Sequence, residues 1–258
     1  MEVIGILIIL IFQVVFAEIH GDSYFFIFNV IFGGYLVFNV VGNLLSISLV
    51  DTSVFATQET MTVSRFLNDP SANEWNLCEK CEIVVPPRSW HCDTCRCCQL
   101  KRDHHCIFAS NCIGYLNHRF FMVFLVHFCI ATIYATCYNS YYIWILNGDQ
   151  YLNLYTLIKM LLPMLMLVNS TMKELNLFFY LLTIIGACFT GVLLIFHGNL
   201  IIRNTTTHER NKGSYDGGLK KNLSLVFGKR WLSVFFWPFV KSDLPEVYWK
   251  TEETIKNK

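Results

Sequence analysis

The sequence predicts an all-α polytopic membrane protein with four transmembrane helices and one cysteine-rich domain on the cytosolic side. Of its 258 residues, 54% are apolar and only 15% are charged, a composition that disfavours an ordinary soluble chain. Four apolar runs have about the length that a membrane helix needs, and eight of the 11 cysteines fall between Cys78 and Cys112. The net charge of +1 averages over segments of different character and excludes no class of partner by itself.

The apolar runs can cross a bilayer as helices, for which about 20 apolar residues are needed. They cover residues 3–19, 24–50, 119–146 and 175–202. Only His20–Ser23 separates the first two runs, so we expect residues 1–50 to form a tight transmembrane hairpin. A cleaved signal peptide over residues 1–17 is the alternative, but the leading region carries Glu2 and no lysine or arginine, which a signal peptide requires.

The distribution of lysine and arginine predicts which loops face the cytosol, because positively charged loops stay on that side of the membrane. Residues 51–118 carry a basic set that comprises Arg65, Lys80, Arg88, Arg96, Lys101 and Arg102, and eleven more basic residues follow residue 202. Between residues 147 and 174 there are only Lys159 and Lys173. We therefore expect both termini and the cysteine-rich segment to be cytosolic.

This pattern divides the chain into four parts. They are the transmembrane hairpin 1–50, the cytosolic cysteine-rich domain 51–118, the transmembrane part 119–202 and the cytosolic tail 203–258. Within the third part, residues 154–168 are apolar but number only about 15 and include Lys159 and Pro163, so we expect a re-entrant or interfacial lumenal segment. In the tail, residues 231–240 are rich in tryptophan and are expected at the cytosolic membrane interface, with an ordinary buried helix as an equal alternative.

The cysteine-rich segment interleaves cysteine with histidine, which is typical of metal binding. In chain order its members are Cys78, Cys81, His91, Cys92, Cys95, Cys97, Cys98, His104, His105, Cys106 and Cys112. Paired C-x2-C units indicate zinc, because two thiolates from one tight turn fit adjacent corners of a tetrahedron. Two closed sites would use eight of these eleven candidates and leave three over.

The spacing alone does not say which three residues are left over. If His104 and Cys106 are among them, a thiol and an imidazole lie beside Asp103, which is the arrangement of a nucleophile, a base and an orienting acid. The alternative is a zinc module in which every member is bound to metal or inert. A membrane adaptor without catalytic activity would then be the function.

The run Asp103-His104-His105-Cys106 resembles the signature of the DHHC family of protein S-acyltransferases, and the cysteine pattern around it is similar throughout. Further similarities are Pro87-Arg88 before His91, Asn117–Phe121 at the start of the third expected helix, Thr206–Glu209 as the TTxE element, and Asn222–Gly228 preceded by Tyr215-Asp216. The resemblance covers nearly the whole chain. Two departures are Ile107-Phe108, where most members have Pro-Trp, and Asp69-Pro70-Ser71 in place of Asp-Pro-Gly; neither removes a ligand or a catalytic group.

The resemblance implies two structural zinc ions. One would be held by Cys78, Cys81, His91 and Cys98, and the other by Cys92, Cys95, His105 and Cys112. Four protein ligands leave no open position for water, so each zinc ion would have a structural role. Cys97 is left without an assigned role.

The activity that the resemblance implies is transfer of a long-chain fatty acyl group from acyl-CoA, such as palmitoyl-CoA, to cysteine thiols of other proteins. Cys106 would be the nucleophile, His104 the base and Asp103 the orienting acid, with Thr206 and Thr207 supporting Asp103. An acyl-enzyme and ping-pong kinetics are expected. The partners would be acyl-CoA, membrane lipid and substrate proteins at the cytosolic face of the endoplasmic reticulum or Golgi membrane, and no nucleic acid.

Two further sets of residues are expected to contact the acyl donor, the first by similarity to relatives and the second because basic side chains bind phosphates. The acyl chain would lie along Phe108, Phe121, Phe124 and Ala131, although plain packing of an apolar helix explains the same residues. The CoA phosphates would contact Arg88, Arg96, Lys101 and Arg102, with an orientation-setting basic loop as the equal alternative.

Overall fold

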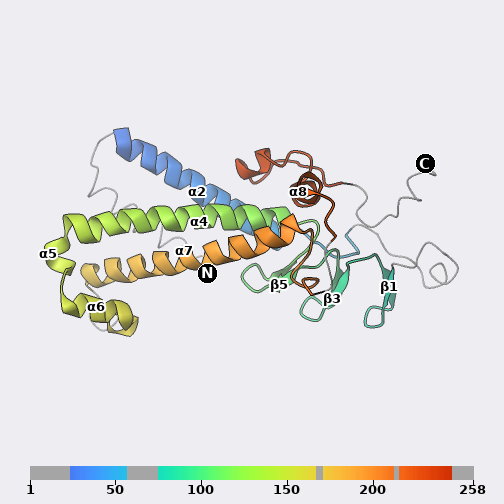
Figure 1. The fold of residues 1–258 in the computed structure, drawn as a ribbon, viewed down its shortest axis with the longest axis horizontal. Helices are drawn as coiled ribbons and strands as arrows, with labels where there is room; N and C mark the ends of the chain where they lie inside the picture. Colours follow the sequence, from blue (N-terminus) through green and yellow to red (C-terminus); the bar gives the residue numbers. More distant parts are fainter. Residues whose placement is uncertain (1–23, 57–74, 167–170, 212–214, 246–258) are drawn as a thin grey trace. The chain divides into compact units, whose positions relative to one another are not determined.

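A computed structural model describes residues 24–56, 75–166, 171–211 and 215–245 (Figure 1). The chain divides into two compact units, each built from segments that are far apart in the sequence. Among the described residues, the first, which we call the helical unit, comprises residues 24–41, 125–166 and 171–194, and the second, the cysteine-rich unit, comprises residues 42–56, 75–124, 195–211 and 215–245. Each of the three long helices contributes residues to both units.

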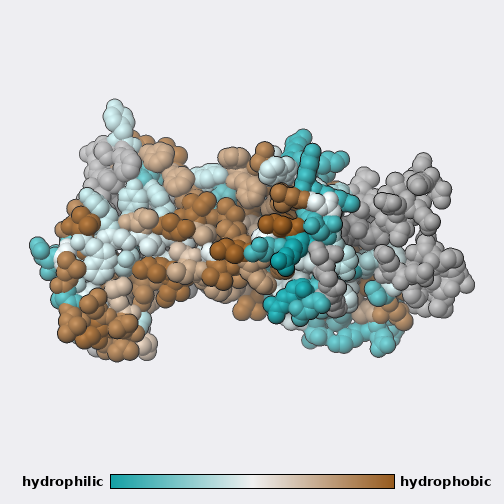
Figure 2. Space-filling view, viewed as in Figure 1, coloured by the Kyte–Doolittle hydropathy of each residue, from teal (hydrophilic) through white to brown (hydrophobic). Residues whose placement is uncertain are grey.

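Three described helices are long and apolar enough to cross a membrane. They are α2 (Tyr24–Leu49), α4 (His118–Ser140) with its π-helical continuation η2 (Tyr141–Leu146), and α7 (Met172–Ile202). Apolar side chains are exposed along all three, and Figure 2 shows a largely hydrophobic surface over α4 and α7. Three of the four expected spans are thereby supported, whereas the first, residues 3–19, lies outside the described residues.

The prediction of an all-α chain is wrong in the cysteine-rich segment, where the described residues form three two-stranded antiparallel sheets. The strands are β1 (Asn76–Cys78), β2 (Ile83–Val85), β3 (Trp90–Cys92), β4 (Cys97–Gln99), β5 (His104–Cys106) and β6 (Asn111–Ile113). Each sheet is a short hairpin that returns the chain to its starting point. Metal ligands that are a few positions apart must meet at one ion, and a hairpin makes this reversal, so the ligand spacing itself favours strands here.

A small hydrophobic core lies beside the hairpins. It consists of Val54, Val85, Cys98, Leu100 and Tyr115, which are at most 5% exposed. The segment that follows α2 joins this core through its backbone, because the N–H of Val54 donates to the carbonyl of Cys98 and the N–H of Leu100 donates to the carbonyl of Thr52. The chain leaving α2 therefore pairs with β4, which fixes the hairpins to the end of that helix.

The tail folds back onto the end of α7. Asn222, in α8 (Leu219–Phe227), donates from its amide to the carbonyl of Ile202 at 2.6 Å and to Asp216 Oδ1 at 2.7 Å. Gly228 ends α8 with φ 74°, and a Cβ at this position would lie 2.4 Å from Ser242 Oγ. The motif 222–228 therefore holds α8 against the helix that leads into it.

The tryptophan-rich stretch 231–240 contains only one turn of 3-10 helix, η4 (Ser233–Phe235), so the alternative of an ordinary buried helix is wrong. Trp231 and Trp237 are 40% and 52% exposed, and Phe236 and Phe239 are exposed beside them. A place at the membrane interface stays a prediction for this stretch.

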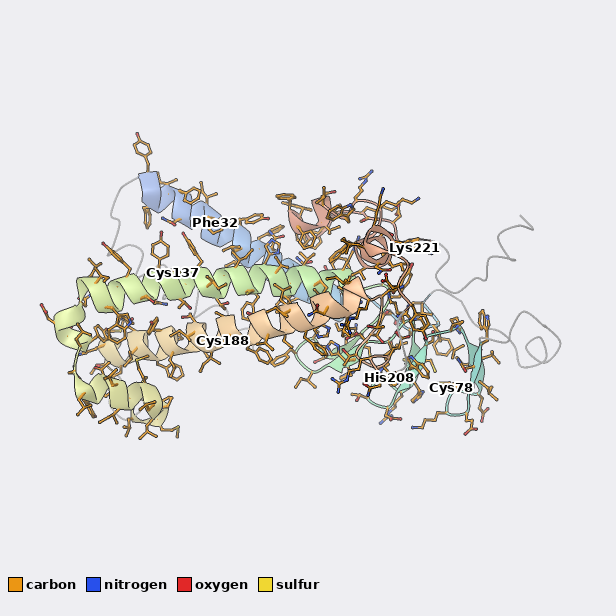
Figure 3. The ribbon with its side chains drawn as sticks, in the orientation of Figure 1. Phe32, Cys78, Cys137, Cys188, His208 and Lys221 are labelled. Atoms are coloured by element: carbon orange, nitrogen blue, oxygen red, sulfur yellow. The ribbon has the colours of Figure 1, made fainter. Side chains whose placement is uncertain are left out.

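In the helical unit, short elements connect α4 to α7. They are α5 (Gly148–Tyr151), α6 (Leu154–Leu161) and η3 (Pro163–Met166). At 1.5 Å per residue α6 is about 12 Å long, far less than the roughly 30 Å core of a bilayer, so α6 does not span it. The lumenal placement of residues 154–168 stays a prediction, and residues 167–168 lie outside the described part. Cys137 and Cys188, which have no assigned role, are exposed on α4 and α7 (Figure 3).

Candidate active site

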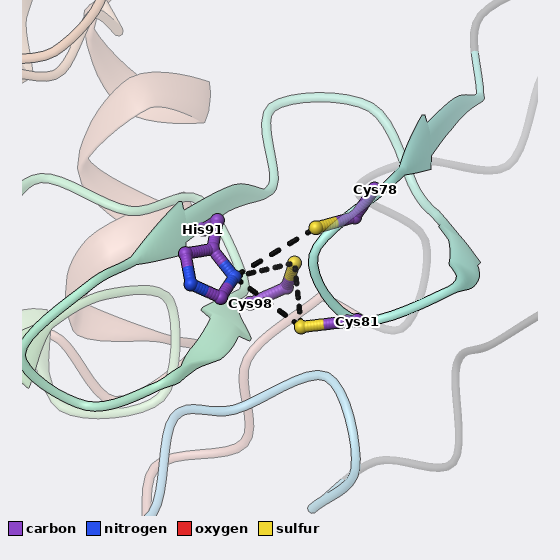
Figure 4. A group of neighbouring side chains, drawn as sticks. All are labelled: Cys78, Cys81, His91 and Cys98. Carbon is purple, nitrogen blue, oxygen red and sulfur yellow. Dashed lines mark hydrogen bonds between the residues drawn. The ribbon is translucent and has the colours of Figure 1, made fainter.

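The first group of metal-ligating side chains comprises Cys78, Cys81, His91 and Cys98, which point toward one another (Figure 4). His91 Nδ1 lies 3.7 Å from Cys78 Sγ and 3.2 Å from Cys81 Sγ, and Cys98 Sγ lies 3.9 Å from Cys81 Sγ. In a tetrahedron with bonds of about 2.3 Å to sulfur and 2.0 Å to nitrogen, ligand atoms are about 3.5–3.8 Å apart. The group therefore fits one zinc ion.

The second group comprises Cys92, Cys95, His105 and Cys112. His105 Nδ1 lies 3.8 Å from Cys92 Sγ, 3.3 Å from Cys95 Sγ and 3.7 Å from Cys112 Sγ. The sulfur atoms of Cys95 and Cys112 are 3.6 Å apart. These spacings match the same tetrahedron, so the structure brings together both of the ligand sets that the resemblance implies.

The two groups interleave because neighbouring side chains of a strand point to opposite faces. In β3, His91 belongs to the first group and the next residue, Cys92, to the second. Cys98 lies opposite His91 in the register of the β3–β4 hairpin and joins the first group with it. One hairpin thus supplies ligands to both groups and holds them together.

The same alternation in β5 separates metal binding from the candidate chemistry. His105 lies opposite Cys112 in the hairpin register and joins the second metal group. His104 and Cys106 flank it and share the other face of the strand. Neither residue belongs to a Cys–His metal group, and the two side chains hydrogen-bond to each other. A buried thiol and an imidazole are therefore left side by side.

Asp103 directly precedes β5, and its carboxylate holds His104 in place. Oδ2 accepts a hydrogen bond from His104 Nδ1 at 2.7 Å. Thr207 donates its backbone N–H to Oδ1 at 2.8 Å and its hydroxyl to Oδ2 at 2.9 Å. Because Nδ1 is engaged with Asp103, Nε2 is the nitrogen of His104 that is available to Cys106.

The electrostatics of the site favour a thiolate–imidazolium pair. Burial disfavours the thiolate of Cys106, but hydrogen bonds from His104 and from the backbone of Ala109 outweigh it and lower the pKa of the thiol. Burial likewise opposes the imidazolium of His104, but hydrogen bonds with Asp103 and Cys106 raise its pKa to about 9. Despite burial, the hydrogen bond from His104 and the charges of nearby histidines hold the pKa of Asp103 below its usual range. The site thus stabilises a charged thiolate, imidazolium and carboxylate together.

Only one of the two expected threonines contacts the aspartate. Thr207 makes both of the hydrogen bonds to Asp103. Thr206 is buried, and its backbone N–H donates to Glu209 Oε2 at 3.1 Å. Within the described part of the chain, the hydroxyl of Thr206 has no hydrogen-bond partner. The contact to the aspartate therefore comes from Thr207.

The turn that carries Thr207 is fixed by a buried charged network. Arg88 forms a two-point ion pair with Glu209, with Nε–Oε1 and Nη2–Oε2 distances of 2.6 Å and 2.5 Å. Arg88 and Lys101 both donate to Asn204 Oδ1 at 3.2 Å. Burial and the charge of Arg88 lower the pKa of Lys101 to about 7. The network ties residues 204–209 to the hairpins and so sets the position of Thr207.

The residues expected to contact CoA differ in burial. Arg88 and Lys101 are 7% and 3% exposed and belong to the charged network, which argues against a contact with CoA phosphates. Arg96 is exposed and Arg102 is half-buried. These two residues remain the candidates for such a contact.

The residues expected along the acyl chain differ in burial and belong to both units. Phe121 is buried, and its ring centroid lies 5.2 Å from that of His104 in an edge-to-face contact. Phe124 is half-buried, and Phe108, two positions after Cys106, is 55% exposed. Ala131 belongs to the helical unit.

Two residues of the site were missed from the sequence. His197, on α7, has its Nδ1 3.6 Å from Asp103 Oδ2, and Asn204 joins the network of Arg88. A signal was present for His197, because a polar ring inside an otherwise apolar membrane run is expensive and typically functional. For Asn204 the only signal was its place two positions before the TTxE element.

This chain is similar in sequence to known proteins. The pattern of the DHHC palmitoyltransferase family matches residues 71–214. The probable palmitoyltransferase ZDHHC24 of Rattus norvegicus is 37% identical over 218 residues, which are 82% of this chain and 73% of that protein. The probable protein S-acyltransferase 12 of Arabidopsis thaliana is 34% identical over 162 residues, 59% of this chain and 50% of that protein. From residues 161–163 and 231–239 we expect similarity to the twenty-fourth mammalian member of the family, and the match to the Rattus norvegicus protein confirms that similarity for the chain as a whole.

Proposed function

Because the chain belongs to the DHHC palmitoyltransferase family and is a protein S-palmitoyltransferase, we propose that Cys106 is the nucleophile that carries the acyl group from acyl-CoA to the substrate protein. The observation that carries this proposal is the shared face of β5. His104 and Cys106 hydrogen-bond there outside both Cys–His groups, and Asp103 binds the other nitrogen of His104 at 2.7 Å. An activated thiol requires this order of nucleophile, base and orienting acid.

In the first half-reaction, the Cys106 thiolate attacks the carbonyl carbon of the acyl-CoA thioester. The bond between the carbonyl carbon and the CoA sulfur breaks, and the electron pair stays on that sulfur. His104 gives its Nε2 proton to the CoA thiolate and becomes neutral. The products are acyl-Cys106 and free CoA.

In the second half-reaction, a cysteine of the substrate protein takes the place of CoA. Neutral His104 accepts the proton of the substrate thiol, and the resulting thiolate attacks the acyl carbon. The bond to the Cys106 sulfur breaks, so the thiolate–imidazolium pair of the resting enzyme is restored. One thioester replaces another, and the reaction needs no energy source beyond the acyl donor.

Asp103 orients His104 and stabilises its imidazolium without taking the proton itself. The low pKa of Asp103, despite burial, supports a carboxylate that stays charged through both half-reactions. Thr207 binds both carboxylate oxygens and so fixes the direction in which Oδ2 points. The chain's own hydrogen bonds thus preset the base before acyl-CoA arrives.

The two Cys–His groups would hold zinc in a structural role, because each already offers four ligands. Bound zinc supplies a fixed geometry to the hairpins, and no step of the reaction passes through it. His105 would bind zinc on the face of β5 opposite Cys106, so the nucleophile stays outside the metal group.

The nucleophile can be tested with purified protein in lipid nanodiscs and a clickable palmitoyl-CoA. Cys106→Ala is expected to lose the hydroxylamine-sensitive label while its zinc content, measured by metal analysis, stays at the wild-type value. Cys97→Ser is the matched control, because Cys97 lies in the same segment but outside both metal groups, and it is expected to label normally. Undiminished labelling of Cys106→Ala would refute the assignment.

For the acyl-CoA substrate we propose that the acyl chain extends from Cys106 past the apolar side chain of Phe121. Burial of a long acyl chain is favourable by about 0.8 kcal/mol per CH2, which favours an active site at the membrane face. The CoA phosphates would meet Arg96 and Arg102, the less buried of the basic candidates. Charge reversal at Arg96 is expected to raise KM for palmitoyl-CoA more than it lowers kcat.

We further propose a cytosolic active site in the endoplasmic reticulum or Golgi membrane, with α6 against hydrocarbon on the lumenal side. Leu157 and Leu161 of α6 are 55% and 82% exposed, whereas Lys159 is only 6% exposed. Lys159 pairs with the buried Glu174, and its ammonium lies 4.1 Å from the centre of the Tyr155 ring. A helix that exposes leucine and buries its charge is inverted relative to a helix in water, and lipid surroundings account for both features.

Carbene reagents test the placement of α6 on the unmodified protein in nanodiscs. A lipid-soluble reagent is expected to label residues 154–164 as strongly as residues 141–146, and a water-soluble reagent is expected to leave both segments unlabelled. Labelling of Leu157 and Leu161 from water would refute the placement. Protection from both reagents would instead indicate a protein that covers α6.

A further inference from the structure

A second buried imidazole faces the aspartate of the active site. His197, on α7, is 4% exposed, and its Nδ1 lies 3.6 Å from Asp103 Oδ2. Its ring centroid lies 5.4 Å from that of His104. The rings of Phe121 and Phe196 flank it, with centroids 4.9 Å and 5.1 Å away. All of these residues belong to the cysteine-rich unit.

Packing alone does not explain a histidine at this position. Aromatic side chains flank the ring, and Nδ1 has no hydrogen-bond partner among the residues that the structure describes. A buried polar nitrogen without a partner is destabilising, so phenylalanine would be the more stable residue between these aromatic side chains. The polar atom that Nδ1 faces is Asp103 Oδ2, the same oxygen that accepts from His104.

A third metal site is the alternative explanation, because ligand atoms of Asp103, His104 and His197 lie within 4.8 Å of one another. The distance of 2.7 Å between His104 Nδ1 and Asp103 Oδ2 argues against it. Two ligand atoms bound to one zinc ion at about 2.0 Å stand about 3.3 Å apart, whereas a charge-assisted hydrogen bond has a length of about 2.7–2.9 Å. The group is therefore a carboxylate between two imidazoles.

The position of His197 suits a second donor to the Asp103 carboxylate. Asp103 is 2% exposed, and a buried carboxylate is stabilised by each N–H that is directed at it. The distance of 3.6 Å between His197 Nδ1 and Asp103 Oδ2 is longer than a hydrogen bond, and catalytic hydrogen bonds that are long in a free enzyme shorten as the reaction proceeds.

We propose that His197 is a positioning residue for acyl transfer, whose Nδ1–H supports the Asp103 carboxylate and so helps Asp103 to hold His104 in place during formation of the acyl-enzyme. The inference rests on the proposed roles of Cys106, His104 and Asp103. One continuous segment then supplies two donors to Asp103: His197 near the end of α7 and Thr207 just after that helix.

Three substitutions of His197 separate hydrogen bonding from packing. His197→Asn places an amide N–H at the position of Nδ1, His197→Gln places it at the position of Nε2, and His197→Phe keeps a ring without a donor. Each variant is measured in nanodiscs for the single-turnover rate of acyl-enzyme formation, for KM of palmitoyl-CoA and for zinc content. Cys106→Ala serves as the blank. Loss of a hydrogen bond to a charged group corresponds to a fall in rate of about 10- to 100-fold.

We expect this fall for His197→Phe and His197→Gln, with KM within about twofold of the wild type, and a loss below about threefold for His197→Asn. The inference is overturned if the Asn variant is as slow as the Phe variant, which would indicate packing, or if the Phe variant acylates at the wild-type rate. If the Phe variant does not fold, as judged by its zinc content, the comparison of Asn with Gln decides. A Cys106→Ala protein that still forms an acyl-enzyme would refute the proposed nucleophile instead, so the two failures are distinguishable.

Discussion

Replacement of Thr207 by valine removes one hydrogen bond from Asp103 and leaves the shape of the side chain almost unchanged. The hydroxyl donates to Asp103 Oδ2 at 2.9 Å, whereas the backbone N–H that donates to Oδ1 at 2.8 Å survives the substitution. A hydrogen bond to a charged group contributes about 1.5–3 kcal/mol, and because Thr207 is half-buried the lower half of that range applies. At 1.36 kcal/mol per tenfold, we expect acyl-enzyme formation to slow about 10- to 40-fold.

The assay for Thr207→Val is single-turnover labelling of Cys106 by clickable palmitoyl-CoA with rapid quenching. Two controls bracket the effect: Thr207→Ser keeps the hydroxyl, and Thr206→Val removes a hydroxyl that has no partner among the described residues. Both are expected to stay within about threefold of the wild-type rate. An unchanged rate for Thr207→Val, or a larger loss for Thr206→Val, would show that this hydrogen bond does not position the base.

The charge states, the buried ion pair and the zinc groups each give a measurable outcome. The pKa of Cys106 is lowered and that of His104 is raised to about 9. The acylation rate should therefore fall as pH drops through the thiol pKa, where the thiolate is lost, and fall again as pH rises through about 9, where His104 loses its proton. A rate that is flat across about pH 8–10 contradicts this expectation. Arg88→Met leaves Glu209 buried and unpaired and should destabilise the fold by about 3–5 kcal/mol, while adding Glu209→Met should recover part of that loss in thermal unfolding; a double variant no more stable than Arg88→Met counts against the pair. Stepwise removal of zinc by a chelator should lower acylation and metal content together, and activity that survives complete removal would contradict the structural role of the metal groups.

The membrane helices could be predicted from the sequence because hydrophobic length is a property of one continuous segment. The apolar runs 24–50, 119–146 and 175–202 correspond to α2, to α4 with η2, and to α7, with ends that differ by at most three residues. No long-range contact is needed to define such a helix, since every backbone hydrogen bond lies within it.

The metal-ligating candidates were also predictable, but the spacing alone could not choose among them. The missing information was the strand at residues 104–106, which the all-α prediction did not allow. Once β5 is known to be extended, alternation assigns His105 to one face and His104 and Cys106 to the other. The ligand set therefore depended on a local conformation that composition does not reveal.

Contacts between segments that are far apart in the chain could not be predicted from the sequence. Arg88 and Glu209 are 121 positions apart, and Thr207 and Asp103 are 104 positions apart. Arg88 therefore looked like a phosphate ligand, because a basic residue in a loop gives no local sign that a buried carboxylate will meet it. The distinction between Thr206 and Thr207 has the same origin, since it depends on how the turn after α7 faces Asp103.

The order of residues from Asp103 to Cys106 follows from the period of a strand. Because side chains alternate, His105 must face away from His104 and Cys106. Its place opposite Cys112 in the metal group fixes the rotation of β5 and thereby the direction of the thiol. One residue inserted between His104 and His105 would put the base and the metal ligand on the same face, and would separate the base from the thiol by one more position. Metal binding and nucleophilic chemistry are therefore compatible in this three-residue strand because the metal ligand stands between the base and the thiol.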